Sequence, residues 1–142
     1  YVIFFLTPYS KRLARSVKKE QKCYFYDWTF LNDTAKRFEN YIAVELKVLI
    51  ELWNDAGKGK YELNFVRTRD GKETDFLIVK NGTPWILFEV KYSSENIDKH
   101  HSQHAYILGD IPVVQIIAKP GITKKEKNNK FFVVSASRFF GA

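Results

Sequence analysis

The chain contains one cysteine, Cys23, and no methionine among its 142 residues. One cysteine cannot form an internal disulfide, so a reducing compartment is the expected environment. The spacing of Cys23 to other potential ligands indicates no zinc site. Because the sequence has no methionine and starts on a strand-like segment, we expect it to be part of a longer protein.

Long hydrophobic runs are also missing. The apolar residues 1–6 are too few to span a bilayer, and they lack the basic segment and small-residue cleavage site of a secretion signal. The sequence therefore predicts a cytoplasmic protein with no membrane partner. It contains no Gly-x-x-x-x-Gly-Lys-Ser/Thr loop, so this chain alone is not expected to hydrolyse ATP.

The composition is that of one globular domain. Hydrophobic residues make up 45% of the chain and aromatic residues 16%, and the aromatic residues are spread along it. This length supports one hydrophobic core and leaves little room for a second. We therefore expect a single domain over residues 1–142.

The net charge of +7 is concentrated in two basic segments. The first spans residues 11–22 and contains Lys11, Arg12, Arg15, Lys18, Lys19 and Lys22, and the second spans residues 119–130. Such clusters attract polyanions through counterion release, so we predict that the first segment binds the backbone of DNA. A pair of solvated loops would explain the same charge.

Hydrophobic periodicity predicts the order of strands and helices. Residues 1–6 and 23–28 have the pattern of strands. A helix then starts at Asn32 or Asp33 and ends before Gly57, with an apolar stripe of Phe38, Tyr41, Ile42, Leu49 and Leu52. Strands over residues 61–67, 74–80 and 85–92 form an antiparallel meander, followed by a helix over 94–108 and strands over 113–118 and 131–134. This order indicates an α/β fold with a mixed β-sheet flanked by helices.

Two of these strands carry charged side chains within apolar runs. Asp75 precedes Phe76-Leu77-Ile78-Val79, and Glu89 and Lys91 close the run that starts at Trp85. Burying charge costs several kcal/mol unless the charge is paired or binds a metal. Carboxylates are the usual protein ligands of Mg²⁺, so Asp75 and Glu89 are predicted to bind Mg²⁺ or Mn²⁺. Lys91 would orient the attacking water or offset charge on the phosphorane in phosphodiester hydrolysis.

The register of the hairpin decides whether these carboxylates meet. With a two-residue Asn81-Gly82 loop, Lys80 pairs with Thr83, Asp75 faces Phe88 and Glu89 points to the other side of the sheet. With a three-residue loop, Lys80 pairs with Pro84 and Asp75 lies opposite Glu89. We therefore predict the three-residue, bulged loop.

The first helix offers two further carboxylates. Glu39 shares a face with Ile42, Ala43 and Leu46, whereas Glu45 falls within the apolar stripe. Either glutamate could complete the catalytic site, and the sequence does not choose between them.

These residues also resemble a known superfamily. Asp75 followed by Glu89-Val90-Lys91, after a helix with Glu39-Asn40 and Glu45-Leu46, resembles the PD-(D/E)XK nucleases, although Thr74 replaces the proline. That resemblance implies a restriction-endonuclease-like fold with an αβββαβ core. Further stretches resemble the uncharacterised C-terminal domain of archaeal and bacterial AAA-type ATPases: Pro8-Tyr9-Ser10, residues 22–27, residues 67–76 and residues 89–93. The resemblance implies an ATPase domain N-terminal to this chain.

Other interpretations of the same residues remain open. The domain could be a catalytically inactive regulatory domain of the ATPase, with Glu73 facing Lys91 and Asp75 facing Arg67 or Arg69 in a structural ion-pair network. His100, His101 and His104 are expected at the surface or facing phosphate, and Cys23 is expected to be a small buried apolar residue.

Overall fold

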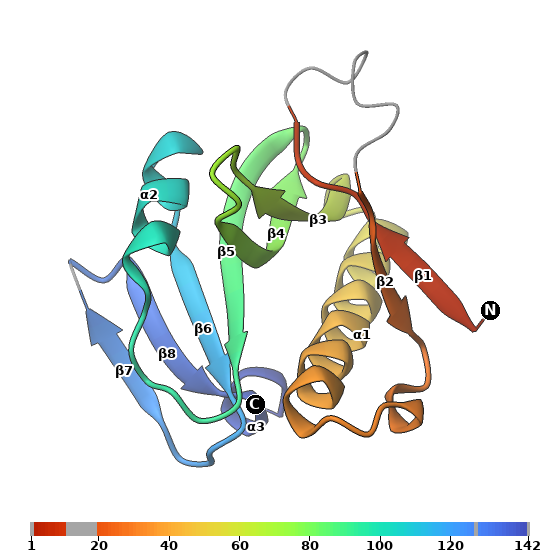
Figure 1. The fold of residues 1–142 in the computed structure, drawn as a ribbon. Coiled ribbons are helices and arrows are strands. Elements are labelled where there is room, and N and C mark those ends of the chain that lie inside the picture. The colour runs from red at the N-terminus through yellow and green to blue at the C-terminus, as the bar shows by residue number, and fades with distance from the viewer. Residues whose placement is uncertain (1, 11–19, 127, 142) are drawn as a thin grey trace.

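The computed structural model describes residues 2–10, 20–126 and 128–141 of the chain. Within them, six strands form a mixed sheet in the order β3-β4-β5-β6-β8-β7, and β1 and β2 form a separate antiparallel pair (Figure 1). The α/β class predicted from the sequence is confirmed. Basic residues 11–19, which include most of the predicted DNA-binding segment, lie outside the described residues.

The chain order of the elements follows most of the predicted pattern. The bounds are β1 Ile3–Leu6, β2 Lys22–Phe25, a 3-10 turn Trp28–Phe30, α1 Thr34–Asp55, β3 Tyr61–Arg67, β4 Glu73–Lys80, β5 Thr83–Lys91, α2 Lys99–Ile107, β6 Val113–Ile117, β7 Thr123–Glu126, β8 Phe131–Ser135 and α3 Ala136–Phe140. The second strand ends three residues earlier than predicted, because Asp27 accepts a hydrogen bond from the Thr29 amide and starts the 3-10 turn. No helix of the described residues is long and apolar enough to cross a membrane.

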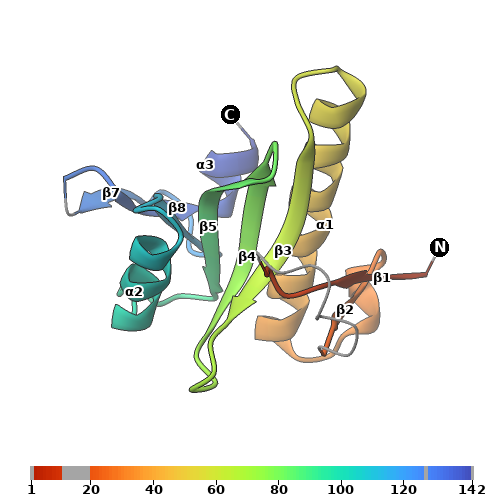
Figure 2. The ribbon, with the colours of Figure 1, turned by 90° about the horizontal axis from the view of Figure 1, so that it is seen from above.

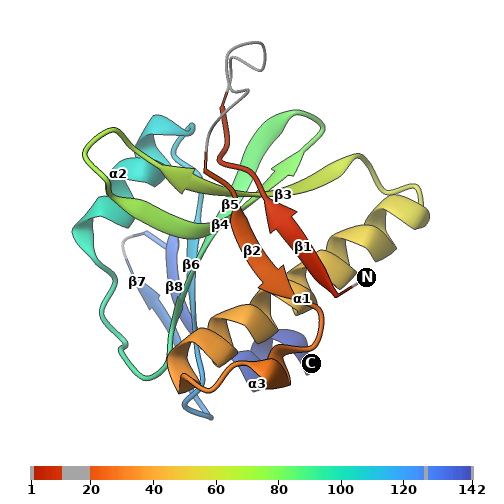
Figure 3. The same cartoon turned by 45° about the vertical axis from the view of Figure 1, so that its right-hand side comes forward.

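Helices cover both faces of the sheet. Helix α1 packs on one face with α3 and the β1–β2 hairpin, and α2 packs on the other, as the view from above shows (Figure 2). The hairpin lies beside α1, with Phe4, Leu6 and Tyr24 buried in the core between them (Figure 3). The fold therefore sets β2 next to α1 at the end of the sheet where β4 begins.

Helix α1 begins at its cap and buries a different face from the predicted one. The Asp33 carboxylate accepts a hydrogen bond from the Lys36 amide at 2.9 Å, which satisfies a backbone donor of the first turn. Its buried residues are Asn40, Ile42, Ala43, Leu46 and Ile50. Leu52, predicted in the apolar stripe, is 60% exposed, so that part of the prediction is wrong.

The hairpin between β4 and β5 reaches the predicted register by another route. Lys80 pairs with Thr83 across a two-residue Asn81-Gly82 loop, both residues having positive φ, so the predicted three-residue loop is wrong. A bulge at Trp85 then shifts the ladder, because Val79 pairs with Pro84 while Ile78 pairs with Ile86. The last pair, Phe76 with Phe88, leaves Asp75 and Glu89 at the next position on the two strands.

The C-terminal half departs from the prediction in two places. Residues 94–98 are not helical, since the buried Gln115 side chain donates hydrogen bonds to the carbonyl oxygens of Ser94 and Asn96 at 2.8 and 3.0 Å. Strand β7 was not predicted, and it pairs antiparallel with β8 at the edge of the sheet.

Candidate metal centre

Asp75 of β4 and Glu89 of β5 join these two neighbouring strands by hydrogen bonds beyond the last backbone pair between them. The Asp75 amide donates to Glu89 Oε1 at 3.2 Å, and the Val90 amide donates to Asp75 Oδ2 at 3.0 Å. Each carboxylate thus takes the place of a backbone acceptor. The predicted proximity of the two acids is present.

A second bulge directs the Asp75 side chain. Val66 pairs with Thr74 while Asn64 pairs with Leu77, so Phe65 of β3 faces both Asp75 and Phe76 of β4. The extra residue interrupts the alternation of side chains along β4. Thr74 consequently contacts α2, whereas Asp75 Oδ1 faces Lys22 of β2.

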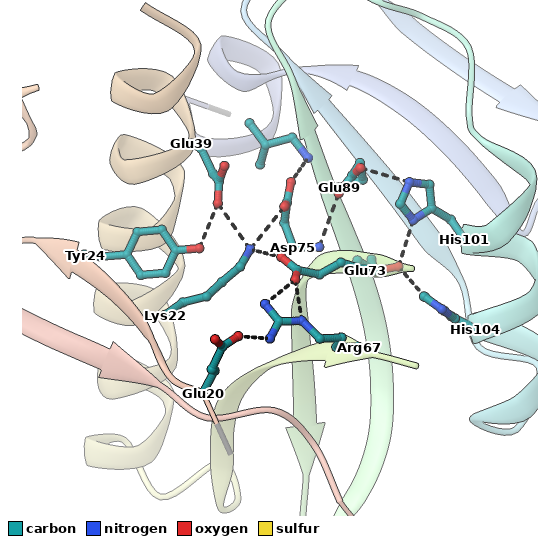
Figure 4. Close-up of polar contacts among 12 residues, drawn as sticks. Glu20, Lys22, Tyr24, Glu39, Arg67, Glu73, Asp75, Glu89, His101 and His104 are labelled. Atoms are coloured by element: carbon teal, nitrogen blue, oxygen red, sulfur yellow. Dashed lines mark hydrogen bonds and ion pairs between the residues drawn. The ribbon is translucent and has the colours of Figure 1, made fainter. Parts of the chain in front are cut away.

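Lys22 lies where three carboxylates converge (Figure 4). Its Nζ is 2.6 Å from Glu73 Oε1, 3.5 Å from Asp75 Oδ1 and 3.5 Å from Glu39 Oε1. The Lys22 side chain is only 19% exposed. The sequence placed Lys22 in a DNA-binding segment, but here its charge is already paired with acidic groups inside the domain.

Helix α1 supplies Glu39 and fixes the position of β2. The Tyr24 hydroxyl donates to Glu39 Oε1 at 2.8 Å. The neighbouring Asn40 side chain is buried, accepts from the Phe25 amide at 2.9 Å and donates to the Phe25 carbonyl at 2.6 Å. Among the described contacts, none joins Glu45 to the other carboxylates, so Glu39 is the helix glutamate that belongs to this cluster.

Burial and mutual repulsion shift the ionisation of the cluster. Burial, together with the charge of Glu89, raises the pKa of Asp75 to about 7. Burial and Asp75 also raise the pKa of Glu39. Burial lowers the pKa of Lys22, but its attraction to Asp75, Glu39 and Glu73 outweighs that effect and the net shift is upward. The Lys22 ammonium therefore stays charged among the three carboxylates and partly neutralises them.

Glu73 and Arg67 extend the cluster toward solvent. Arg67 contacts Glu73 Oε2 through Nη2 at 2.7 Å, and its Nη1 contacts Glu20 at 2.7 Å. Burial raises the pKa of Glu73, but hydrogen bonds from Lys22 and Arg67 lower it overall. Glu73 was not among the predicted site residues. The expected pairs of Glu73 with Lys91 and of Asp75 with Arg67 are replaced by Glu73 with Arg67 and Asp75 with Lys22.

Lys91 lies two residues after Glu89 on β5, and its side chain is partly exposed to solvent. Its Nζ is 3.4 Å from Glu89 Oε2, and its side chain is 38% exposed. The amine is thus held by one carboxylate while still reachable from solvent.

The histidines of α2 lie on the other side of Glu89. His101 and His104 are buried, so the expectation that they are at the surface is wrong for these two. His101 Nε2 is 2.9 Å from Glu89 Oε2, and His100 Nε2 is 2.9 Å from the Glu73 carbonyl oxygen. Ligand atoms of Asp98, His100 and His101 also lie within 4.8 Å of one another. The spacing of His101 and His104, one helical turn apart, was a signal for a shared buried face.

A cavity of about 270 Å³ lies between β2 and α1, and of the clustered carboxylates Glu39 lines it. Its lining includes Lys22, Tyr24, Lys36, Glu39 and Cys23. Cys23 is exposed, so the expectation that it is a buried residue is wrong.

The donor set fits a hard divalent cation in charge and atom type. Among the described side chains of this cluster, five can carry negative charge and three carry positive charge, which leaves two negative charges in excess: Glu20, Glu39, Glu73, Asp75 and Glu89 against Lys22, Arg67 and Lys91. Carboxylate oxygens are the ligands that Mg²⁺ and Mn²⁺ prefer. A bound ion would compete with the Lys22 ammonium for Asp75 and Glu39, because both are attracted to the same oxygens.

Comparisons with known proteins place the chain in a family without an assigned role. No curated protein matches it. A solved structure, the refined half-complex from a tetradecameric assembly of Thermococcus gammatolerans McrB AAA+ hexamers with bound McrC, matches with a TM-score of 0.43 and 15% identity. The match covers 72% of this chain and 27% of that chain. The model of a domain of unknown function, DUF4143, matches residues 35–139, and the chain therefore belongs to the DUF4143 family.

Proposed function

We propose that this domain hydrolyses phosphodiester bonds in DNA with the help of Mg²⁺ or Mn²⁺. The observation that supports this most is the convergence of acidic groups from α1, β4 and β5. Glu39 and Asp75 both pair with the Lys22 ammonium, and the Asp75 amide donates a hydrogen bond to Glu89. Carboxylates kept at this density in a buried setting are costly unless cations neutralise them. The resemblance to PD-(D/E)XK nucleases points in the same direction.

The residues of the chain have distinct parts in this proposal. Asp75 and Glu89 would hold the ion, and Glu39 would complete its environment. A bound Mg²⁺ would polarise the scissile phosphate and activate a water molecule. Lys91, partly exposed and held by Glu89, would orient that water and offset the charge that develops on the phosphorane. The basic segment that precedes β2 would bind the DNA backbone.

The context of the domain is part of the same proposal. The sequence resemblance supports an AAA-type ATPase domain that precedes this domain, and we propose that the protein acts in the cytoplasm. The ATPase would deliver or remodel the DNA on which the domain acts.

A cleavage assay tests the proposal. The full chain is incubated with supercoiled and branched DNA in Mg²⁺, in Mn²⁺ and in EDTA. We expect metal-dependent cleavage that Asp75→Asn and Lys91→Met each reduce at least 100-fold, because both remove groups that act on the reacting atoms. Glu45→Gln is the matched control on α1 and should cleave like the parent. Cleavage that survives both substitutions would exclude this site as its source.

The ion pairs of Lys22 support a second candidate function, that of a regulatory or docking domain. Its ammonium already sits 2.6 to 3.5 Å from three carboxylates, so the cluster can be stable as a metal-free ion-pair network. The domain would then regulate or dock the ATPase without chemistry. Filter binding to DNA at two salt concentrations, together with titration calorimetry of Mn²⁺, separates the functions. A regulatory domain would bind no Mn²⁺ and would give no cleavage product.

A further inference from the structure

Strand β2 pairs with β1 along one edge, and its other edge faces α1. The Tyr26 amide donates to the Val2 carbonyl oxygen at 3.0 Å, and hydrogen-bonded pairs recur at every second residue of an antiparallel ladder. The N–H and C=O groups of Phe25 and Cys23, one and three residues before Tyr26, therefore point away from β1. They are the backbone groups of β2 that remain for other partners.

The Asn40 side chain already fills this edge at Phe25. Its carboxamide accepts from the Phe25 amide at 2.9 Å and donates to the Phe25 carbonyl oxygen at 2.6 Å. One planar amide thus satisfies both groups of one backbone residue. At Cys23, which is exposed, the described residues supply no such partner. Cys23 therefore offers a donor and an acceptor in the arrangement that binds Asn40 two residues further on.

The cavity of about 270 Å³ lies along the same edge. Cys23, Phe25 and Leu31 line it, and Lys36 lines it from α1, one helical turn before Asn40. Pockets for drug-sized ligands measure roughly 300–1,000 Å³. This cavity is smaller, so it suits a single planar ring system.

A nucleobase has the chemistry that this cavity requires. Each DNA base carries a donor beside an acceptor on its Watson–Crick edge, and can therefore bond to Cys23 as the Asn40 carboxamide bonds to Phe25. A base is uncharged, so it can lie beside the Glu39 carboxylate, which would repel an anion. The exposed Lys36 can bind the phosphate of the same nucleotide.

An extended peptide fits this edge less well. An added β-strand needs a series of N–H and C=O pairs along the edge that it joins. Strand β2 spans only Lys22–Phe25, and Asn40 already uses the pair at Phe25. The one pair that is left, at Cys23, is enough for a base but not for a strand.

We infer that the cavity between β2 and α1 binds one unpaired nucleobase of the DNA, through the backbone of Cys23 and apolar contact with Phe25 and Leu31. The inference rests on the proposed function, because it names the form of DNA that the site takes. Lys22 and Glu39 belong to both the cavity and the carboxylate cluster, so the bound base lies next to the metal centre. An unpaired base enters without the cost of breaking a base pair, so DNA with an unpaired nucleotide is preferred over a full duplex.

The single cysteine of the chain allows a direct test. Full chain labelled with ¹⁵N at cysteine alone gives one backbone amide signal, that of Cys23. In EDTA, a short single-stranded oligonucleotide should move this signal downfield and slow its exchange with water, because the N–H gains an acceptor. The same oligonucleotide built from abasic sites keeps the phosphates and should leave the signal in place. An unchanged signal with the base-containing strand, or an equal shift with the abasic strand, would overturn the inference. A shift with a short valine–threonine peptide and none with DNA would assign the edge to peptides and overturn it as well.

Substitutions at Cys23 test the same contact through affinity. Cys23→Pro removes an N–H that β1 does not use, and proline is tolerated where the amide of an edge strand faces outward. Its affinity for a duplex with one unpaired base, measured by fluorescence anisotropy in EDTA, should fall about 10-fold, whereas Cys23→Ser should bind like the parent. Affinity for a fully paired duplex should be the same in all three proteins. If Cys23→Pro does not fold, Leu31→Trp, which fills the cavity, takes its place with the same expectation. Equal affinities of parent and variant for the unpaired base would refute the base site.

These measurements need no divalent ion and no cleavage. A parent that prefers the unpaired base but cleaves no DNA in Mg²⁺ or Mn²⁺ would refute the nuclease and keep the base site. A parent that cleaves DNA but shows neither the preference nor the Cys23 shift would refute the base site alone.

Discussion

Replacing Lys22 with methionine removes the charge at the centre of the carboxylates but keeps a similar side-chain length. Glu39, Glu73 and Asp75 then face one another without the ammonium that lies 2.6 to 3.5 Å from them. Removing one partner of a buried ion pair costs about 3–5 kcal/mol. Because Lys22 keeps 19% of its surface exposed, we take the lower end, about 3 kcal/mol at pH 8 in EDTA. For a chain of this size the loss corresponds to a fall of roughly 10 °C in Tm.

Divalent cations should restore much of this loss. In Lys22→Met the carboxylates have no competing ammonium, so Mg²⁺ or Mn²⁺ at about 100 times its Kd would add about 2.7 kcal/mol to the free energy of unfolding. Urea unfolding followed by tryptophan fluorescence, with EDTA and with Mg²⁺, measures both effects. In the parent the same Mg²⁺ should add less, because Lys22 competes for the site.

Lys60→Met is the matched control. Lys60 is 79% exposed and pairs at 3.6 Å with the exposed Glu62, so its loss should change stability by less than about 0.5 kcal/mol. A Lys22→Met protein as stable as the parent in EDTA would refute the electrostatic account of Lys22. A loss of stability that no divalent cation reduces would refute the metal centre and leave the ion-pair network as its explanation.

Three further predictions concern stability. The raised pKa of Asp75, about 7 against an ordinary value of 3.8, means that the folded state binds more protons than the unfolded state between these values. The contribution of Asp75 is therefore largest below about pH 4 and is lost as pH rises through 7, by roughly 4 kcal/mol. His101 and His104, whose pKa values are lowered, act in the opposite sense below pH 6.5. The difference between parent and Asp75→Asn in urea unfolding from pH 4 to 8 therefore reports Asp75 together with its effect on the pKa values of Glu39 and His101. A flat difference would contradict the burial of that carboxylate. Asn40→Ala leaves the Phe25 amide and carbonyl unpaired and should cost about 2 kcal/mol in thermal unfolding, whereas Asn64→Ala, at an exposed contact with Thr7, should cost less than about 0.5 kcal/mol. Arg67→Met should cost less than about 1 kcal/mol despite two short ion pairs, since Arg67 lies at the surface; a larger loss would show that Arg67 takes a main part in neutralising the cluster.

The elements that the sequence predicted well depend on local rules. Strand β3 has the predicted bounds, Tyr61–Arg67, because it alternates in pattern and ends at turn residues. Helix α1 has an aspartate cap and a glycine with positive φ just beyond its end. Strand β7 escaped prediction because all of its residues, Thr123–Glu126, are exposed and it has no apolar alternation.

The geometry of the candidate site depends on contacts between distant segments, which local sequence patterns do not predict. The proximity of Asp75 and Glu89 was predicted, but the assumed three-residue loop is absent and the shift comes from a bulge at Trp85. Such a bulge depends on packing between strands and has no signature in the hairpin loop itself. The contact of Lys22 with Asp75 joins residues 53 positions apart, and no periodicity reports a contact of that kind. Glu39 was distinguished from Glu45 only by the docking of β2 on α1.

The docking of β2 also determines how a metal ion and Lys22 could exchange. Asn40 holds the Phe25 backbone with two hydrogen bonds, and Tyr24 is buried against α1, so the strand itself is fixed. The Lys22 side chain, in contrast, has a flexible four-carbon stem and lies beside a cavity of about 270 Å³. Rotation of the side chain can therefore move the ammonium away from Asp75 without displacing the hairpin. We expect metal binding to leave the backbone of β2 unchanged and to alter only the environment of Lys22, because the energy that holds the strand resides in contacts that do not involve its charge.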